Sequence, residues 1–246
     1  PKIWPRLTRS TRIAASDRIR IILISEDEGK GLIYRGIKRF MDILLSVLGL
    51  VILAPIFLIL IVAIKLDSKG PILFRQKRVG THKSHFDILK FRTMRIDTPK
   101  DTPTHMLENP DCYITRVGKF LRKTSLDELP QIINILKGEM SIVGPRPALW
   151  NQYDLIAQRD LFGANDVPVG LTGWAQINGR DELEIEVKAQ LDGEYARKIG
   201  LGMDLRCFFG TFLSVFRGDG VVEGGTGSVR KKNQDARITE EDASIE

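Results

Sequence analysis

Hydrophobic and polar residues divide this chain into regions of different character. Residues 43–64 form 22 consecutive uncharged positions, mostly leucine, isoleucine and valine, between Asp42 and Lys65. The segment before this run is rich in arginine, and glycine and charged residues dominate from residue 218 onward. We therefore expect an N-terminal extension over 1–33, either disordered or an expression remnant, a membrane helix over 34–66, a folded domain over 67–217 and a flexible tail over 218–246.

The uncharged run is long enough for a membrane helix, because 22 helical residues rise about 33 Å, close to the thickness of a hydrocarbon core. A helix buried in a soluble core is the alternative. Pro55 lies near the middle, where it removes a backbone hydrogen bond and kinks a helix. Basic residues flank both ends, Lys38 and Arg39 on one side and Lys65 on the other, which places both ends in the cytoplasm. A re-entrant helix that turns at Ala54-Pro55 satisfies both observations, whereas a simple span satisfies only the length.

The folded domain shows shorter patterns. Two strands, at 71–74 and 86–91, flank a polar turn at 80–84, and alternation along the second puts Lys90 and Arg92 on one face. Apolar positions from 129 to 136 predict a helix with one buried stripe. A similar stripe from 205 to 216 favours core packing over a position in the membrane interface. The fold class that we expect is α+β, a re-entrant membrane helix joined to a mostly helical domain with a small β-hairpin.

The net charge of +6 indicates an anionic partner, and nucleic acid, lipid headgroups and phosphorylated substrates all qualify. Two cysteines, far apart, and three histidines have no zinc-ligand spacing. A metal in this protein would therefore need oxygen ligands.

Asp127 and Glu128 are the candidate catalytic residues. Ser125 and Glu128 have capping-box spacing, but a helix capped by Ser125 would have Pro130 as its fifth residue, without an N–H to donate. A helix capped by Asp127 has Pro130 in its first turn. Adjacent carboxylates in that setting can also divide two tasks, one attacking phosphorus and the other holding a divalent cation or a proton. The residues alone leave capping and catalysis open.

Positively charged residues surround this pair in the sequence. Arg146 lies in the stiff segment Gly144-Pro-Arg-Pro147, and Arg180 ends a glycine-rich segment that begins at Gly170. Arginine forks suit phosphate oxygens and stabilise the charge that develops in phosphoryl transfer. A generic basic surface is the alternative. We predict that the substrate phosphates are bound by Lys90, Arg92, Arg122, Arg146 and Arg180.

Five motifs occur in order: Lys38-Arg39-x-x-Asp42, Lys90-Phe-Arg-Thr-Met94, Ser125-Leu-Asp-Glu-Leu-Pro-Gln131, Gly144-Pro-Arg-Pro147 and Thr172-Gly-Trp-Ala-Gln176. Together they resemble the bacterial sugar transferase family, the small monotopic polyprenyl-phosphate phosphoglycosyl transferases, over residues 34–217. The resemblance implies that Asp127 attacks the sugar-bearing phosphate of a UDP-sugar, expels UMP and forms a phosphosugar-aspartate intermediate. Polyprenyl (undecaprenyl) phosphate then takes the phosphosugar, as the first membrane step of polysaccharide (exopolysaccharide) or glycoconjugate synthesis.

The same resemblance associates Glu128, beside Asp127, with a required Mg²⁺. It matches Lys90, Arg122 and Arg146 to positions that contact phosphates, and we add Gln176 to this set. It implies a catalytic domain on the cytoplasmic face of the inner (plasma) membrane, with membrane lipids as partners. Ala54 replaces the serine that often precedes the proline of the membrane break. Only 33 residues precede the matching region, so we expect the minimal form of the family.

Two other classes of function remain open. A membrane-tethered protein that binds anionic lipid or nucleic acid explains the charge, but it does not explain adjacent carboxylates among arginines. Nucleic acid is disfavoured because Trp174 stands alone and the phenylalanines fall at core spacing. A glycosyltransferase that releases UDP would need metal ligands such as an Asp-x-Asp motif, which the sequence lacks. We therefore predict a phosphoglycosyl transferase.

Overall fold

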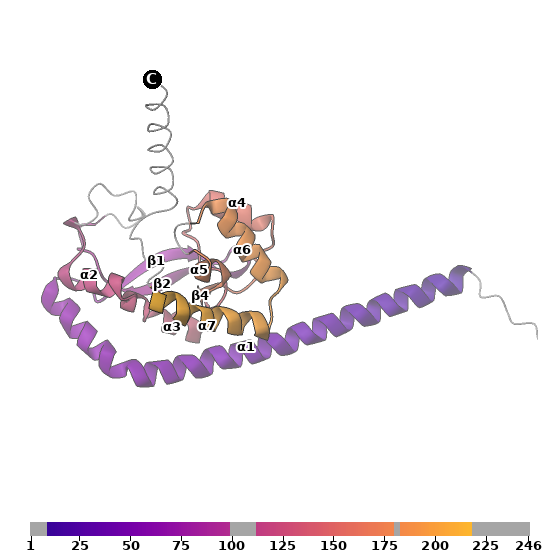
Figure 1. Cartoon of the computed structure of the whole chain (residues 1–246), viewed down its shortest axis with the longest axis horizontal. Coiled ribbons are helices and arrows are strands. Elements are labelled where there is room, and N and C mark those ends of the chain that lie inside the picture. Colours follow the sequence, from indigo (N-terminus) through magenta and orange to yellow (C-terminus); the bar gives the residue numbers. More distant parts are fainter. Residues whose placement is uncertain (1–8, 99–111, 180–182, 218–246) are drawn as a thin grey trace, which may run out of the picture. The chain divides into compact units, whose positions relative to one another are not determined.

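The computed structural model of the chain describes residues 9–98, 112–179 and 183–217 (Figure 1). The contacts divide the chain into two compact units, residues 1–41 and 42–246. The second unit contains every strand described and the residues of the predicted site. Among the described residues, the fold is α+β and mostly helical, as the sequence predicted.

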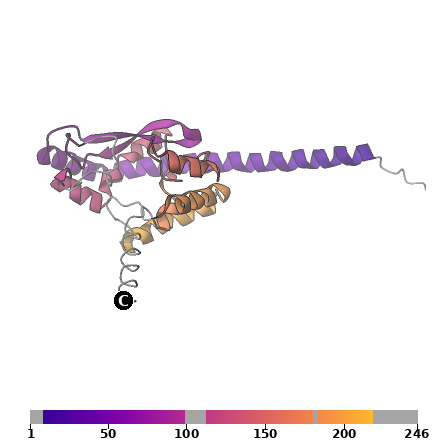
Figure 2. The same ribbon diagram turned by 90° about the horizontal axis from the view of Figure 1, so that it is seen from above.

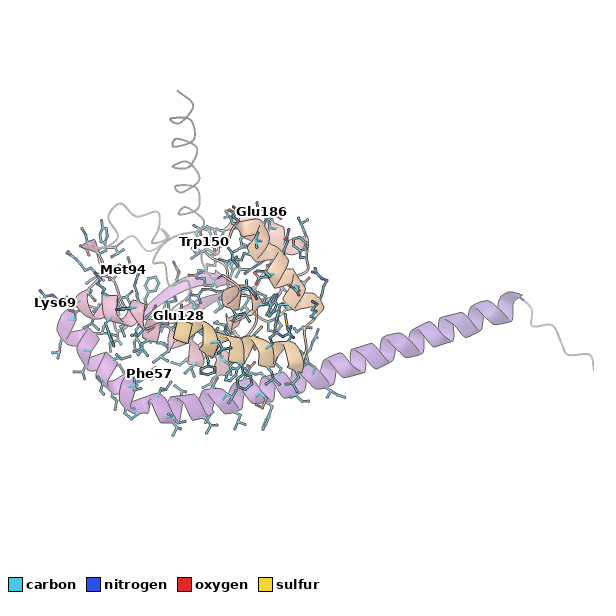
Figure 3. All side chains as sticks on the ribbon, viewed as in Figure 1. Phe57, Lys69, Met94, Glu128, Trp150 and Glu186 are labelled. Carbon is cyan, nitrogen blue, oxygen red and sulfur yellow. The ribbon has the colours of Figure 1, made fainter. Side chains whose placement is uncertain are left out.

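Helix α1 runs from Arg9 to Asp67 and so includes residues 9–33 of the predicted N-terminal extension, whose assignment as a separate region stays a prediction. Its segment Gly31–Asp67 is long and apolar enough to cross a membrane, by length and composition. Pro55 lies inside the helix, which bends close to Phe57 (Figures 1 and 3). A proline removes a hydrogen bond and clashes with the preceding turn, and this explains a bend at that point. The predicted break is therefore a kink in a continuous helix.

The segment of α1 after Pro55 has one face on the domain and one face exposed. Leu60 and Ile64 are buried with Phe91, and the rings of Phe57 and Phe91 lie 5.4 Å apart. On the opposite side, large apolar residues are more than half exposed, among them Leu58, Ile59 and Val62. An exposed apolar stripe of this kind marks a surface that contacts membrane or another apolar partner.

Polar contacts attach residues 42–67 of α1 to the domain at both ends. The Asp42 carboxylate accepts a hydrogen bond from the backbone N–H of Ile142 (2.9 Å), and the Asp67 carboxylate accepts one from Val117 (3.1 Å). Each contact satisfies a backbone donor that secondary structure leaves unpaired. The apolar part of α1 and the domain are therefore joined at residues 42 and 67.

Two small sheets form the β part of the domain. Strands β1 (Leu73–Val79) and β2 (His85–Phe91) make an antiparallel hairpin in which Phe74 pairs with Lys90. Strands β3 (Ser141–Val143) and β4 (Gly170–Thr172) pair in parallel. In Figure 2 the purple hairpin and the orange-to-yellow helices α6 (Ile185–Arg197) and α7 (Leu201–Arg217) lie on opposite sides of the domain. The remaining helices are α2 (Arg116–Lys123), α3 (Gln131–Lys137), α4 (Tyr153–Asp160) and α5 (Trp174–Ile177).

Three sequence-based expectations need comment. The helix predicted over 129–136 is confirmed as α3, whereas the strand predicted at 71–74 begins at Leu73 and continues to Val79. Core packing of the stripe on α7 is only half right. Phe208 contacts the buried core, but Leu205, Phe209 and Phe212 are each about half exposed or more. The core covers only one edge of the apolar stripe on α7, and the other edge is exposed.

Candidate active site

The acidic pair lies in a short turn of its own, ahead of helix α3. Residues Leu126–Glu128 form a 3-10 turn that follows Ser125, whose φ of 55° is in the left-handed region. Pro130 precedes α3, and no side chain caps either the turn or the helix. Both capping alternatives are therefore wrong, because Asp127 does not cap α3 and Ser125 does not form a capping box. The carboxylates are free for another role.

Glu128, labelled in Figure 3, makes ion pairs with Lys90 and with Arg146. The Lys90 ammonium from β2 donates a hydrogen bond of 2.8 Å to Glu128 Oε1. The Arg146 guanidinium donates to both carboxylate oxygens, over 3.2 Å to Oε2 and also to Oε1. Arg146 follows β3 by three residues, so the hairpin and the β3–β4 sheet each supply one cation. The structure thus brings together three of the predicted site residues.

Electrostatics keep Glu128 ionised. Burial alone would raise the pKa of its carboxyl, but the adjacent charges of Arg146 and Lys90 outweigh burial and hold the pKa well below its usual range. Glu128 therefore stays ionised between the two cations and cannot serve as a proton donor near neutral pH.

Asp127 has the opposite environment. Its side chain is 12% exposed, and Lys90 Nζ, 3.9 Å from Oδ2, is its one ion-pair partner among the described residues. Burial raises the pKa of the Asp127 carboxyl above its usual value, and the charge of Lys90 opposes this shift only in part. The result is a poorly solvated carboxylate, which suits a nucleophile.

Other predicted residues lie around this centre in different ways. Arg122, on α2, donates from Nε to Thr93 Oγ1 (2.9 Å), and its charge lowers the pKa of Asp127. Gln176, on α5, has both amide atoms buried without a hydrogen-bond partner in the part of the chain described. Arg180 lies outside the described residues. The predicted roles of Arg122, Gln176 and Arg180 in phosphate binding stay predictions.

Arg92 does not join the acidic pair. It follows the last residue of β2, and its guanidinium donates to the Ser68 carbonyl (2.7 Å), the Ser68 hydroxyl (2.9 Å) and the Lys69 carbonyl (2.9 Å). Its side chain therefore fastens the end of α1 to the hairpin. Alternation along β2 placed Arg92 beside Lys90, but the strand ends between them, and the alternation ends with it.

The site has a supporting layer that sequence patterns did not reveal. Arg159 on α4 and Asp192 on α6 form a buried ion pair, and Arg159 also contacts the backbone of Arg146. Neither residue belongs to a recognisable motif, and each occupies a helix position where a solvated charge is the ordinary expectation. Nothing in the sequence pattern could have found them.

Asp127 and Glu128 are ligands of the kind that a divalent cation takes. Mg²⁺ prefers oxygen ligands and commonly takes one or two carboxylates together with substrate phosphates and water. Asp127 and Glu128 supply two adjacent carboxylates, and no cluster of three or more metal-ligating side chains occurs among the described residues. The remaining ligands of such a cation would therefore come from substrate and water.

Comparison with known proteins supplies independent evidence. The sequence profile of a family described as "Bacterial sugar transferase" matches residues 33–218. The chain is 42% identical to a UDP-glucose:undecaprenyl-phosphate glucose-1-phosphate transferase of Escherichia coli. The match covers 75% of this chain and 40% of that protein. It is 37% identical to a UDP-N-acetylgalactosamine-undecaprenyl-phosphate N-acetylgalactosaminephosphotransferase of Aeromonas hydrophila. The match covers 76% of this chain and 45% of that protein. It is 36% identical to the exopolysaccharide production protein ExoY of Sinorhizobium fredii. The match covers 72% of this chain and 84% of that protein.

Proposed function

The chain belongs to the bacterial sugar transferase family, and on that premise we propose that it transfers a sugar-1-phosphate from a UDP-sugar to polyprenyl phosphate. The names of two relatives state that those proteins transfer a sugar phosphate to undecaprenyl phosphate, and we propose the same type of reaction for this chain. The chain spans less than half the length of the E. coli and A. hydrophila relatives, so their activity supports the proposal without establishing it.

One observation carries the proposal: two neighbouring carboxylates occupy opposite electrostatic states. Glu128 is paired with Lys90 and Arg146, while Asp127 is buried, poorly solvated and has a raised pKa. A protein that only binds anions gains nothing from a carboxylate beside its cations, because the carboxylate repels the ligand. An enzyme that attacks phosphorus needs both a nucleophile and cations to balance the charge of the transition state.

The proposed reaction has two displacement steps. An oxygen of Asp127 attacks the sugar-bearing phosphorus of the UDP-sugar, and the bond from that phosphorus to the bridging oxygen breaks as UMP leaves with the electron pair. An oxygen of polyprenyl phosphate then attacks the same phosphorus, and the bond to Asp127 breaks. The product is a polyprenyl diphosphate sugar, and the carboxylate is restored.

Each charged side chain has a task in this scheme. Lys90 and Arg146 lie within bonding distance of Glu128, so the diphosphate can enter beside cations that are already fixed in place. Arg122, close enough to Asp127 to lower its pKa, offers a third positive charge at the nucleophile. When bound, Mg²⁺ would neutralise diphosphate oxygens, with Asp127 and Glu128 as its protein ligands.

We place the reaction at the cytoplasmic face of the inner membrane. The exposed apolar stripe of α1 and the basic residues at both ends of the apolar run support a re-entrant arrangement, with the kink at Pro55 inside the membrane. A soluble nucleotide-sugar and the phosphate of a lipid can meet only at such an interface.

The sugar is a separate question. Relatives of similar identity act by name on UDP-glucose and on UDP-N-acetylgalactosamine, so overall similarity does not select between them. A panel of UDP-sugars, tested with undecaprenyl phosphate and Mg²⁺ for UMP release, answers this question and tests the proposed function. We expect UMP with at least one donor, and release of UDP instead would contradict the proposal.

Chelation tests the proposed cation. EDTA should stop UMP release, and Mg²⁺ added in excess should restore it, because in this proposal the cation balances the charge of the diphosphate. Zn²⁺ is the control cation and should restore less UMP release than Mg²⁺, because carboxylate ligands favour Mg²⁺, the harder ion. Undiminished turnover in EDTA would rule the cation out.

A further inference from the structure

The segment that carries Arg146 is held at every backbone carbonyl. We call residues 145–148 the arginine loop. At its two ends the partners are backbone groups. The Pro145 carbonyl accepts from Gly170 N at 2.9 Å, and the Ala148 carbonyl accepts from Val79 N at 2.9 Å. These bonds come from β4 and from the last residue of β1, so the ends of the loop are fixed by the two sheets.

The two middle carbonyls are held by arginine side chains. The Arg146 carbonyl accepts from Arg159 Nη2 at 3.0 Å, and the Pro147 carbonyl accepts from Arg78 Nη1 at 3.1 Å. Proline on each side of Arg146 also restricts the backbone, because its ring fixes φ near −65°. A loop that needed only to connect two elements would leave these carbonyls to water.

Arg159 differs from Arg78 in being fully enclosed. The side chains of Arg159 and Asp192 are 3% and 1% exposed. Arg159 donates from Nε (2.8 Å) and Nη2 (2.6 Å) to the same oxygen, Asp192 Oδ2. The other oxygen, Oδ1, is buried and has no partner among the described residues. The pair therefore leaves part of its hydrogen-bonding capacity unused.

Such a pair is a poor means of stabilising a fold. Removing two charges from water costs as much as their attraction returns, and apolar replacements of equal volume are often neutral or stabilising. The pair nevertheless lies in the lobe formed by α4 and α6, beside the apolar cluster that contains Leu155 and Ala189. Apolar side chains could have filled this space, so the charge is best explained by what Arg159 reaches, the carbonyl of Arg146.

We propose that Arg159, held by Asp192, is a positioning residue that fixes the Arg146 guanidinium against Glu128. This inference rests on the proposed function, because it assigns Arg159 to the same phosphoryl-transfer site. Arg159 acts only through the arginine loop. It holds the backbone of Arg146 from the α4–α6 lobe, while the side chain of Arg146 extends to Glu128 on the other side of the loop.

The main variant replaces the pair by apolar residues, Arg159→Met with Asp192→Leu, so that no buried charge is left alone. We expect the doubly substituted protein to fold and kcat/KM to fall about 10- to 100-fold, the effect of a misplacement of about 1 Å. A second variant, Arg159→Lys, keeps the charge but loses the planar fork that reaches two acceptors at once. It covers the case in which the apolar pair does not fold, and we expect a loss of the same order.

Leu155→Ala is the matched control, because it weakens the apolar cluster that Leu155 shares with Ala148 of the arginine loop but removes none of the four hydrogen bonds to the loop's carbonyls. The discriminating measurement repeats the substitutions in an Arg146→Lys background. If Arg159 acts through Arg146, replacing Arg159 in the Arg146→Lys protein should change kcat/KM by less than about 2-fold, because the effects of coupled residues are not additive. An equal loss in both backgrounds, an equal loss in Leu155→Ala, or full activity of the pair variant would each overturn the proposal.

A readout without turnover separates this inference from the proposed function. Arg146 donates to both carboxylate oxygens of Glu128, so displacing Arg146 should free its guanidinium, and nitrogen-15 NMR of the arginine side-chain N–H groups can follow their exchange with water. We expect the Arg146 side-chain N–H groups to exchange faster in the pair variant and at the wild-type rate in Leu155→Ala. An unchanged exchange rate contradicts the positioning role even in a protein that transfers no sugar. Failure of the wild type to release UMP contradicts only the proposed function.

Discussion

At the scale of single residues, the main feature is the contrast between two neighbours in sequence. Glu128 takes both nearby cations in bonding contact, and Asp127 is left with one cation at 3.9 Å and little solvent. The pKa of Glu128 falls below its usual range, and the pKa of Asp127 rises. A shared environment therefore produces one carboxylate that stays ionised and a second whose protonated form is favoured by burial.

The raised pKa of Asp127 predicts the acid limb of the pH profile. Only the ionised carboxylate can attack, so kcat/KM should rise with pH as Asp127 loses its proton, at a pH above the usual range of an aspartate. Replacing Lys90 by Met removes the largest charge that lowers this pKa, so the limb should move to higher pH. Enzyme held at each pH and assayed at neutral pH controls for unfolding. A limb that moved to lower pH would contradict this assignment.

The same shift predicts an effect on stability. A carboxyl with a raised pKa favours folding while it is protonated, and this contribution is lost as pH rises through the folded-state pKa. At neutral pH the ionised Asp127 therefore opposes folding. Asp127→Asn should abolish UMP release while the melting temperature stays equal to or above that of the wild type. Glu128→Gln is the contrasting variant, because it removes a stabilising charge, and its melting temperature should fall. A marked destabilisation of Asp127→Asn would contradict this reasoning.

At the scale of elements, sequence patterns located helices and strands better than the residues at which these elements begin and end. Periodicity found α3 and the hairpin, and the motifs found Asp127, Glu128, Lys90 and Arg146. Local rules failed for the turn after Ser125, because the acidic pair forms a 3-10 turn of its own that ends at Glu128, before α3 begins at Gln131. They also failed for Arg92, because alternation says nothing about where a strand stops. The pairing of Arg159 with Asp192 depends on helix packing, which no local pattern encodes.

The position of Arg92 predicts a structural effect at the end of α1. Replacing Arg92 by Met leaves two carbonyls and a hydroxyl without their donor, and we expect the free energy of unfolding to fall by about 2–3 kcal/mol. The KM for the donor should change little. Arg95→Met is a matched control, because Arg95 pairs with Asp97 on the surface and such pairs contribute about 0–1 kcal/mol. A large rise in KM with unchanged stability would instead support the sequence-based assignment of Arg92 to phosphate binding.

At the scale of the whole molecule, the second compact unit combines an apolar helix with a charged site. Residues 42–67 of α1 are attached to the domain at both ends, and apolar side chains between them face outward. A kinked helix fixed in this way is suited to entering one leaflet and returning to the same side.

Cysteine accessibility tests that topology. Single cysteines at Gly31 and Lys69, in a protein without Cys112 and Cys207, should both resist a membrane-impermeant thiol reagent in intact cells and react once the cells are opened. Labelling of Gly31 alone before opening would establish a spanning helix. Pro55→Leu removes the source of the kink and should shift the labelling toward that outcome.

The central claim is that Asp127 forms a covalent bond to the phosphosugar, and a single-turnover experiment tests it most directly. The protein is mixed with a UDP-sugar donor and Mg²⁺ without polyprenyl phosphate, quenched, and analysed by intact-protein mass spectrometry and peptide mapping. We predict release of UMP in an amount equal to that of the enzyme, together with a gain in mass of one phosphosugar located on Asp127. UMP release without an adduct, or an adduct on another residue, would contradict the claim.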